Sequence, residues 1–195
     1  MAMPASPSHA AGPAGPNGSL ARLAAWDRTA SRRIAVGWPH PRWFTLPLAA
    51  VSSTANYGVV WFVLAALPWA FGVQRGSSRF LYIAASVFGT EIFTFCLKVL
   101  FDRRRPPERE PGPAQLIALP RSRSFPSSHA SMGMVGLLTT AALYPGWWAP
   151  LAVLVAVLAF SRVYLRVHYL ADVLAGLVLG TALGLLITHV VATPR

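Results

Sequence analysis

The stretch VLAGLVLGTALGLLITHVV at residues 173–191 decides the fold class, because it contains no Asp, Glu, Lys or Arg. An α-helix rises about 1.5 Å per residue, so a helix of this length nearly crosses the roughly 30 Å hydrocarbon core of a bilayer. Gly176, Gly180 and Gly184 recur every four residues along one face of such a helix. Small residues at this spacing favour close helix packing, either within a bundle or between two copies of the chain.

Three further apolar stretches precede this one. Residues 56–73 and 80–97 are each long enough for one crossing, and neither contains a basic residue. Residues 130–161 are too long for one crossing and are broken by the segment YPG at 144–146, which predicts a hairpin of two helices. The sequence therefore predicts an all-α, multi-pass transmembrane bundle with five crossings.

Two positions in this region have more than one interpretation. Residues 43–53 are apolar but contain Pro47, so they would form a short or tilted helix and bring the bundle from five helices to six. Glu91 is an ionisable residue inside an apolar stretch, which favours a functional or ion-pairing role. Packing of Glu91 against another polar group is the equal alternative.

The composition agrees with a membrane protein. Hydrophobic residues make up 54% of the chain and charged residues 12%, against roughly 25% charged residues in soluble domains. The net charge is +11, but the basic residues lie between apolar stretches, where they can meet lipid headgroups or an anionic substrate. We therefore expect a bilayer and an anionic lipid headgroup or substrate as partners, and no nucleic acid.

Three regions follow one another along the chain. Residues 1–18 are rich in Pro, Ala, Gly and Ser, which predicts a disordered tail. Residues 19–42 mix apolar side chains such as Leu20 and Trp26 with several arginines, which is typical of an amphipathic helix on a membrane surface. Residues 43–195 are expected to form the transmembrane domain of a multi-pass cell-membrane protein.

Polar residues gather at one end of the predicted bundle. The second crossing ends at 98–106, the third begins at 126–129, the fourth ends at 161–166 and the last begins at 168–172. Because consecutive crossings run antiparallel, these four segments are expected at the same membrane face. The resulting layer contains Lys98, Arg105, Ser127, Ser128, His129, Arg162, His168 and Asp172.

Three motifs in this layer resemble those of the type 2 phosphatidic acid phosphatase (PAP2) family. Lys98 and Arg105 with Pro106 match its K-x6-R-P element, and the segment PSSH at 126–129 resembles its P-S-G-H, with serine at the glycine position. The segment from 161 to 172 matches S-R-x5-H-x3-D. Three spaced motifs in the family's order are a strong signal, whereas one alone would be weak.

The resemblance implies a membrane lipid phosphatase that works through a phosphohistidine. His168 would be the nucleophile, Asp172 would orient its ring, and His129 would protonate the leaving oxygen. Phosphoryl transfer needs fixed positive groups around the phosphate oxygens, and the residues implied to bind phosphate are Lys98, Arg105, Ser127, Ser128 and Arg162.

No metal or cofactor is expected. The six acidic residues do not form a set of oxygen ligands for Mg²⁺, and the two histidines of the motifs are too few for zinc. For the substrate we favour a polyprenyl pyrophosphate or polyprenyl-linked phosphate, because the chain is small, like bacterial polyprenyl carrier phosphatases. Phosphatidic acid or phosphatidylglycerophosphate is the alternative, and a non-catalytic anion or lipid-headgroup binder or transporter is a third.

Overall fold

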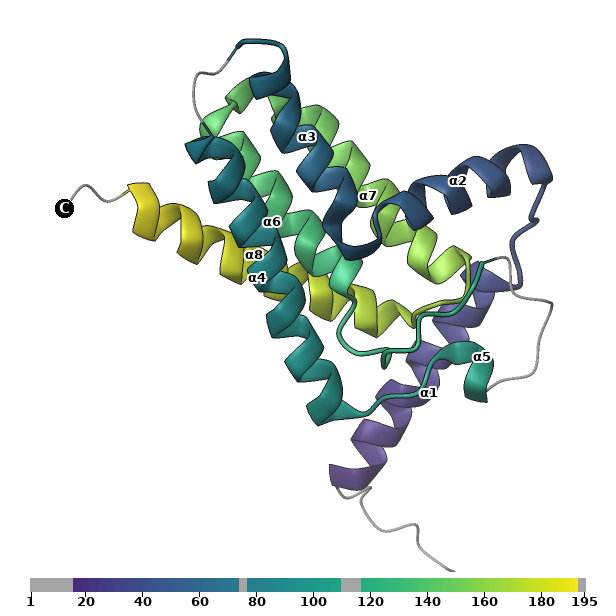
Figure 1. Ribbon diagram of the computed structural model, residues 1–195. Coiled ribbons are helices and arrows are strands. Elements are labelled where there is room, and N and C mark those ends of the chain that lie inside the picture. The colour runs from purple at the N-terminus through teal and green to yellow at the C-terminus, as the bar shows by residue number, and fades with distance from the viewer. Residues whose placement is uncertain (1–15, 74–76, 110–116, 193–195) are drawn as a thin grey trace, which may run out of the picture.

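The computed structural model describes residues 16–73, 77–109 and 117–192, and within these ranges the chain is helical with no strand (Figure 1). The all-α prediction is therefore confirmed. The helices are α1 (Pro16–Ala35), α2 (Arg42–Thr54), α3 (Val59–Ala70), α4 (Ser78–Phe101), α5 (Pro106–Arg109), α6 (Ser128–Leu143), α7 (Trp148–Tyr164) and α8 (Leu170–Ala192). Short 3-10 turns at Asn56–Gly58 and Pro145–Trp147 precede α3 and α7.

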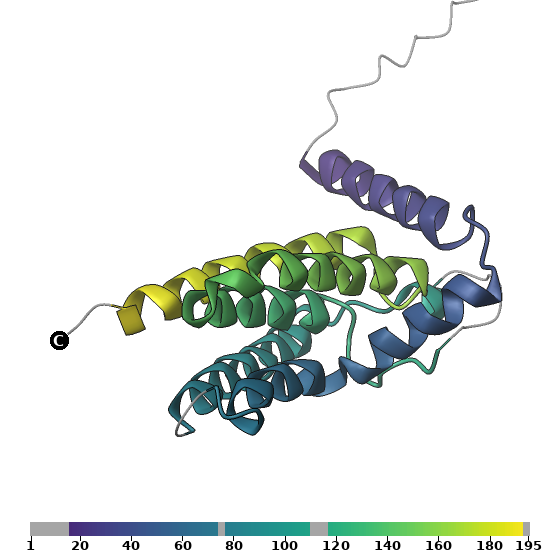
Figure 2. The same cartoon turned by 90° about the horizontal axis from the view of Figure 1, so that it is seen from above.

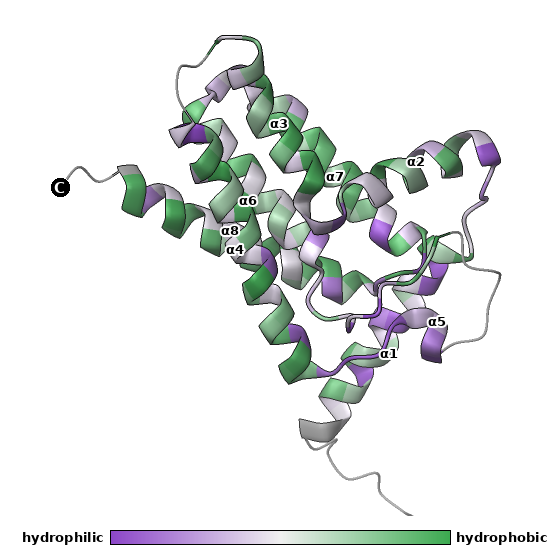
Figure 3. Cartoon of the chain, in the orientation of Figure 1, coloured by the Kyte–Doolittle hydropathy of each residue, from purple (hydrophilic) through white to green (hydrophobic). Residues whose placement is uncertain are grey.

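Helix α6 lies at the centre of the bundle. It packs against α4, α7 and α8, while α3 packs against α4 (Figures 1 and 2). The core between these helices is formed by large apolar side chains that include Trp61, Ile83, Val87, Met132 and Val135. Many other apolar side chains face outward, and hydrophobic residues dominate the bundle helices, whereas hydrophilic residues concentrate around α1 and α5 (Figure 3). This distribution fits a bundle surrounded by lipid with one polar end.

Fewer helices reach the length of a membrane span than the sequence predicts. In the described part of the chain, three segments are long and apolar enough, namely Ser78–Arg109, Pro145–Tyr164 and Leu170–Val191. The pair Arg42–Thr54 and Asn56–Ala70, bent by 59°, would count as a fourth span. Helix α6 has 16 residues, which at about 1.5 Å per residue is shorter than the roughly 30 Å hydrocarbon core of a bilayer. A separate sixth crossing by α2 is not supported, because α2 forms one bent unit with α3.

The prediction of one continuous helix over residues 56–73 is wrong. Tyr57 and Gly58 have φ angles of 54° and 78°, so the backbone turns before α3 begins at Val59. A Cβ at Gly58 would come within 2.8 Å of Val87, and the left-handed conformation also favours glycine there. The turn directs α2 away from the axis of α3 and along α7, which α2 contacts (Figure 1).

The glycine stripe of α8 packs against α6 within the chain. A Cβ at Gly176 would lie 2.5 Å from the carbonyl oxygen of Ser127, and one at Gly180 would lie 2.4 Å from that of Ser131. Gly184 meets Leu138 in the same way. The two helices are therefore as close as their backbones allow, which brings the beginning of α6 next to the beginning of α8. This face is already covered by α6, so a contact between copies of the chain would need another surface.

Helix α1 exposes several large apolar side chains and buries two small polar ones. Leu20, Leu23 and Trp26 are exposed, whereas Asp27 and Ser31 are buried against the rest of the protein. The helix begins at Pro16, slightly earlier than the predicted residue 19, so the predicted tail is shorter than expected. Residues 1–15 of that tail lie outside the described residues. The position of α1 on a membrane surface remains a prediction that the exposed apolar face supports.

Candidate active site

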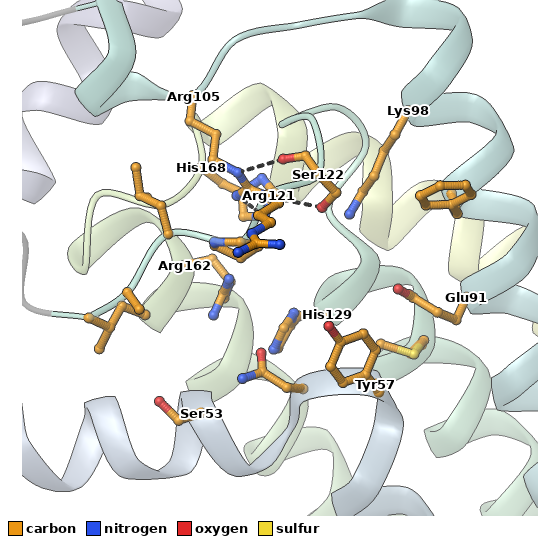
Figure 4. A pocket seen from close by; sticks show the side chains of 17 residues that line it. Ser53, Tyr57, Glu91, Lys98, Arg105, Arg121, Ser122, His129, Arg162 and His168 are labelled. Carbon is orange, nitrogen blue, oxygen red and sulfur yellow. Dashed lines mark hydrogen bonds between the residues drawn. The ribbon is translucent and has the colours of Figure 1, made fainter.

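A cavity of about 640 Å³ opens at the polar end of the bundle (Figure 4). Its charged and imidazole side chains are Glu91, Lys98, Arg105, Arg121, His129, Arg162 and His168. Four of these side chains are cationic and Glu91 is the acidic one, so the cavity wall carries a positive charge. Cationic groups around a cavity partly shielded from water attract anions more strongly than they do on an open surface.

His168 lies in the turn between α7 and α8 and is 2% exposed. Its Nε2 is 3.2 Å from Nη1 of Arg105. Because a guanidinium group has only donors, Nε2 must be the nitrogen without a proton, and Nδ1 therefore carries the proton of the neutral ring. Nδ1 faces Oδ2 of Asp172 at 3.5 Å. The ring is thus fixed in the tautomer whose free lone pair is on Nε2.

The surroundings keep the His168 ring neutral. Burial, and then the positive charges of Arg105, Arg162 and Lys98, lower the pKa of His168 well below its usual value of 6.5. At neutral pH the ring is therefore unprotonated at Nε2 and able to act as a nucleophile.

Asp172 stands behind His168 and does not line the cavity. It is fully buried in the first turn of α8, where its Oδ2 accepts a hydrogen bond from the Ser124 hydroxyl and another, at 2.9 Å, from the backbone N–H of Tyr169. Its Oδ1 accepts from Nη1 of Arg103 at 2.6 Å. These donors fix the carboxylate with Oδ2 toward the imidazole, which is the arrangement that orients a histidine nucleophile.

Arg105 and Lys98 reach the cavity from the end of α4 and the loop after it. Arg105 is 1% exposed, and its guanidinium donates to the carbonyl oxygens of Ser122, at 2.9 Å, and Val167, at 2.7 Å. These bonds hold it in one orientation beside His168. Lys98 is also buried, and its ammonium group points into the cavity (Figure 4).

His129 and Arg162 are both anchored by Ser52 of α2. Nε2 of His129 is 3.2 Å from the Ser52 carbonyl oxygen, and Nη1 of Arg162 donates to the Ser52 hydroxyl at 2.6 Å. A carbonyl only accepts, so Nε2 of His129 carries a proton and Nδ1 is its other functional nitrogen. Nε of Arg162 is a buried donor without a hydrogen-bond partner in the described part of the chain. Such a donor beside a cationic cavity suits an incoming anion.

Ser127 and Ser128 are not among the residues that line the cavity, although both were predicted to bind phosphate. The backbone N–H of Ser127 donates to the carbonyl oxygen of Asp172 at 3.0 Å. The Ser128 hydroxyl lies 3.2 Å from that of Thr94 on α4. Ser127 thus connects α6 to α8, and Ser128 connects it to α4. Among the described residues, neither hydroxyl makes a hydrogen bond to another predicted site residue, and the Ser127 hydroxyl is buried without a partner.

Several residues of the site were missed by the sequence reasoning. Ser52, Arg103, Ser124 and Arg121 lie outside the matched motif positions, and each contacts a motif residue or lines the cavity. Ser52 gave no signal, because it lies in a short apolar segment far from the motifs in sequence. The signal for Arg121 was its place in an Arg-rich loop between two crossings, although no specific position followed from it.

Solved structures of other proteins share the fold of this chain. The chain resembles the crystal structure of a transmembrane PAP2 type phosphatidylglycerolphosphate phosphatase from Bacillus subtilis, with 19% identity, a TM-score of 0.70, and coverage of 89% of this chain and 88% of that chain. It also resembles Aquifex aeolicus LpxE, with 21% identity, a TM-score of 0.69, and coverage of 83% and 93%. At these identities the likeness concerns the fold. No curated protein matches the sequence.

The family assignment comes from the sequence match. The PAP2 superfamily matches residues 79–195, which is more than half of the chain and includes all three motifs. The family predicted from those motifs is therefore confirmed, and this chain belongs to the PAP2 superfamily.

Proposed function

We propose that this chain is a membrane lipid phosphatase that forms a phosphohistidine at Nε2 of His168. The observation that carries the proposal is a neutral, buried imidazole with its unprotonated nitrogen beside a cationic cavity and a fixed carboxylate behind its other nitrogen. An enzyme that moves a phosphoryl group needs this combination of a positioned nucleophile and fixed positive charge. Membership of the PAP2 superfamily supports the same reaction class.

In the first step, Nε2 of His168 attacks phosphorus and the bond from phosphorus to the lipid's oxygen breaks. Arg105, which donates to Nε2, must pass this hydrogen bond to a phosphate oxygen so that the lone pair becomes available. Lys98 and Arg162 would stabilise the charge on the other oxygens. The phosphorylated ring is positively charged, and Asp172 stabilises it through Nδ1–H.

His129 serves as the acid in this step and as the base in the next. Its Nε2–H is directed to Ser52, and burial and the positive charge of Arg162 lower the pKa of His129, so the resting ring has no proton on Nδ1. Nδ1 must gain a proton when the anionic substrate binds, and it then gives this proton to the departing oxygen. Nδ1 then accepts a proton from water as the water attacks phosphorus, the bond to His168 breaks, and inorganic phosphate leaves. The products are phosphate and the dephosphorylated lipid, or the lipid monophosphate when the substrate is a pyrophosphate.

The substrate we favour is a polyprenyl pyrophosphate or polyprenyl-linked phosphate. Four cationic side chains line the cavity, namely Lys98, Arg105, Arg121 and Arg162, and this charge suits a pyrophosphate better than a monophosphate. The same cavity has apolar lining residues such as Phe95, Leu119 and Met132, against which a hydrocarbon chain can pack.

A second candidate is a glycerophospholipid phosphate, such as phosphatidic acid or phosphatidylglycerophosphate. The structural similarity to a phosphatidylglycerolphosphate phosphatase supports it. Glu91, Ser53 and Asn56 also line the cavity, and their oxygens are able to accept hydrogen bonds from the hydroxyl groups of a glycerol headgroup.

Phosphate release by the purified protein from a panel of these lipids tests both candidates. We expect the highest kcat/KM on the polyprenyl pyrophosphate, and a clear preference for a glycerophospholipid phosphate would reverse the order. His168→Ala should abolish release while lipid binding persists. His189→Ala, on the exposed far part of α8, is the matched control. Unchanged release by His168→Ala would contradict the mechanism, and lipid binding without any release by the wild type would favour a binder or transporter.

A further inference from the structure

Helix α1 supplies hydrogen-bond partners for the beginning of α8, the helix that carries Asp172. The backbone N–H of Leu170 donates to the Ser31 hydroxyl at 2.8 Å, and that of Ala171 donates to Oδ1 of Asp27 at 2.8 Å. The first N–H groups of a helix have no partner within it, and a nearby side chain usually satisfies them. Here the partners come from a helix distant in sequence, and Asp172 is the next residue of α8.

Arg103 connects the same Asp27 to Asp172. Its Nη2 is 2.6 Å from Oδ2 of Asp27, and its Nη1 is 2.6 Å from Oδ1 of Asp172. The guanidinium also lies over the ring of Tyr169, with Cζ 4.4 Å from the ring centroid. The side chains of Asp27 and Asp172 are 5% and 0% exposed, and that of Arg103 is 25% exposed. The two carboxylates thus share one cation in a mostly buried cluster.

This sharing has an electrostatic consequence for the proposed nucleophile. With Asp27 present, the positive charge of Arg103 is divided between two carboxylates, so the cluster of three side chains keeps one negative charge. Without Asp27, Arg103 would neutralise Asp172 alone and would be free to pull it away from Nδ1 of His168. An ion pair in a buried site is strong enough to make this difference matter.

We propose that Asp27 is a positioning residue for Asp172, acting through Arg103 and through the beginning of α8. Helix α1 is then part of the active site and not only a membrane-surface helix. This inference rests on the proposed function, because it assigns Asp27 a role in orienting His168. Asp27 itself does not line the cavity and does not touch a reacting atom.

The first test is the Asp27→Asn variant of the full chain, assayed for phosphate release. Loss of an outer hydrogen-bonding partner of a metal-ligating histidine typically reduces activity about 10-fold to 100-fold, and we apply the same range to the partner of this histidine nucleophile. We expect such a fall in kcat, with KM within about twofold of wild type, because the phosphate-binding cations are untouched. Asp102→Asn is the matched control, since it makes the same change at an acid that is 69% exposed and sits at the end of α4. Its kcat should equal that of the wild type.

The second test separates positioning from a merely structural role of α1. If Asp27 acts through Asp172, the double variant Asp27→Asn/Asp172→Asn should be no slower than Asp172→Asn alone. Losses that multiply, or a wild-type kcat in Asp27→Asn, would overturn the inference. A fall in activity that only matches a fall in folded protein, measured by thermal unfolding, would also overturn it.

The outcome also distinguishes this inference from the proposed function. A wild-type kcat in Asp27→Asn together with an inactive His168→Ala would overturn the role of Asp27 and leave the phosphatase mechanism standing. Full activity in His168→Ala would overturn both.

Discussion

Replacement of Asp172 by Asn is the substitution whose effect follows most directly from the hydrogen bonds of the site. A carboxylate offers two acceptor oxygens, whereas an amide offers one acceptor and one donor. Oδ2 of Asp172 accepts from Ser124 and Tyr169 and faces His168, and Oδ1 accepts from Arg103. Whichever way the amide turns, its NH2 group meets at least one of these donors, and the negative charge is lost.

The size of the effect follows from the same contacts. In a serine protease, the corresponding change in a His–Asp pair reduces kcat about 10⁴-fold. Here Nδ1 of His168 and Oδ2 of Asp172 are 3.5 Å apart, which is a weaker contact than a short hydrogen bond. We therefore expect kcat to fall about 10³-fold, or roughly 4 kcal/mol in activation free energy. KM should change little, because Asp172 does not line the cavity.

The assay is phosphate release from the preferred lipid in detergent micelles, with kcat and KM determined separately. His168→Ala defines the background and Asp102→Asn controls for removal of one negative charge near this end of the bundle. A loss in kcat of less than about tenfold in Asp172→Asn would refute the reasoning, because a merely local contact of this kind is worth only a fraction of a kcal/mol.

Three further predictions concern the charge, packing and metal requirement of the site. In the pH profile of kcat/KM, the fall on the acid side that reports protonation of His168 should lie well below pH 6.5, because the pKa of His168 is lowered. Lys98→Met removes one of the positive charges that lower this pKa, so the fall should move to higher pH. An unchanged position of the fall in Lys98→Met would contradict this prediction. Gly180→Ala should lower the free energy of unfolding by about 1–3 kcal/mol, measured by thermal unfolding, because the added Cβ would lie 2.4 Å from the Ser131 carbonyl oxygen. Gly89→Ala is the control, since Gly89 lies in α4 with open space around it, and this change should not destabilise the protein. Turnover should persist in excess chelator, and loss of activity restored by a divalent metal would contradict a metal-independent mechanism.

The convergence of the motifs at one end of the bundle could be predicted, because it depends only on antiparallel helices and short connections. Lys98, Arg105, His129, Arg162 and His168 line one cavity as that connectivity requires. Helix boundaries in the stretches 80–97, 130–161 and 173–191 were also close, since long runs with few charges leave few alternatives, but the stretch 56–73 did not form one continuous helix.

The parts that could not be predicted depend on contacts between residues far apart in sequence. Ser52 holds both His129 and Arg162, yet nothing in a short apolar segment distinguishes a serine that does so from one that only faces lipid. The turn at Tyr57 arises from an unusual backbone conformation of a residue with no turn preference. Asp27 looked like one polar residue in an amphipathic helix, and only its contacts with Arg103 and α8 give it another role.

The glycines of α8 show that a sequence pattern can predict close packing of a helix without predicting its partner. The spacing of Gly176, Gly180 and Gly184 predicts close packing but does not identify the partner helix. The structure assigns that partner to α6, and the approach is close enough to set the distance between the two motif-bearing helix ends.

The most direct measurement of the central claim is the site of the covalent phosphate. The protein is mixed with its lipid substrate, quenched in alkali within the first turnover, digested and analysed by mass spectrometry. The mechanism predicts a phosphoryl group on the peptide that contains His168, attached at Nε2, stable to alkali, labile to acid and absent from His168→Ala. A phosphoryl group on another residue, or rapid turnover with no phosphorylated peptide at any quench time, would contradict it.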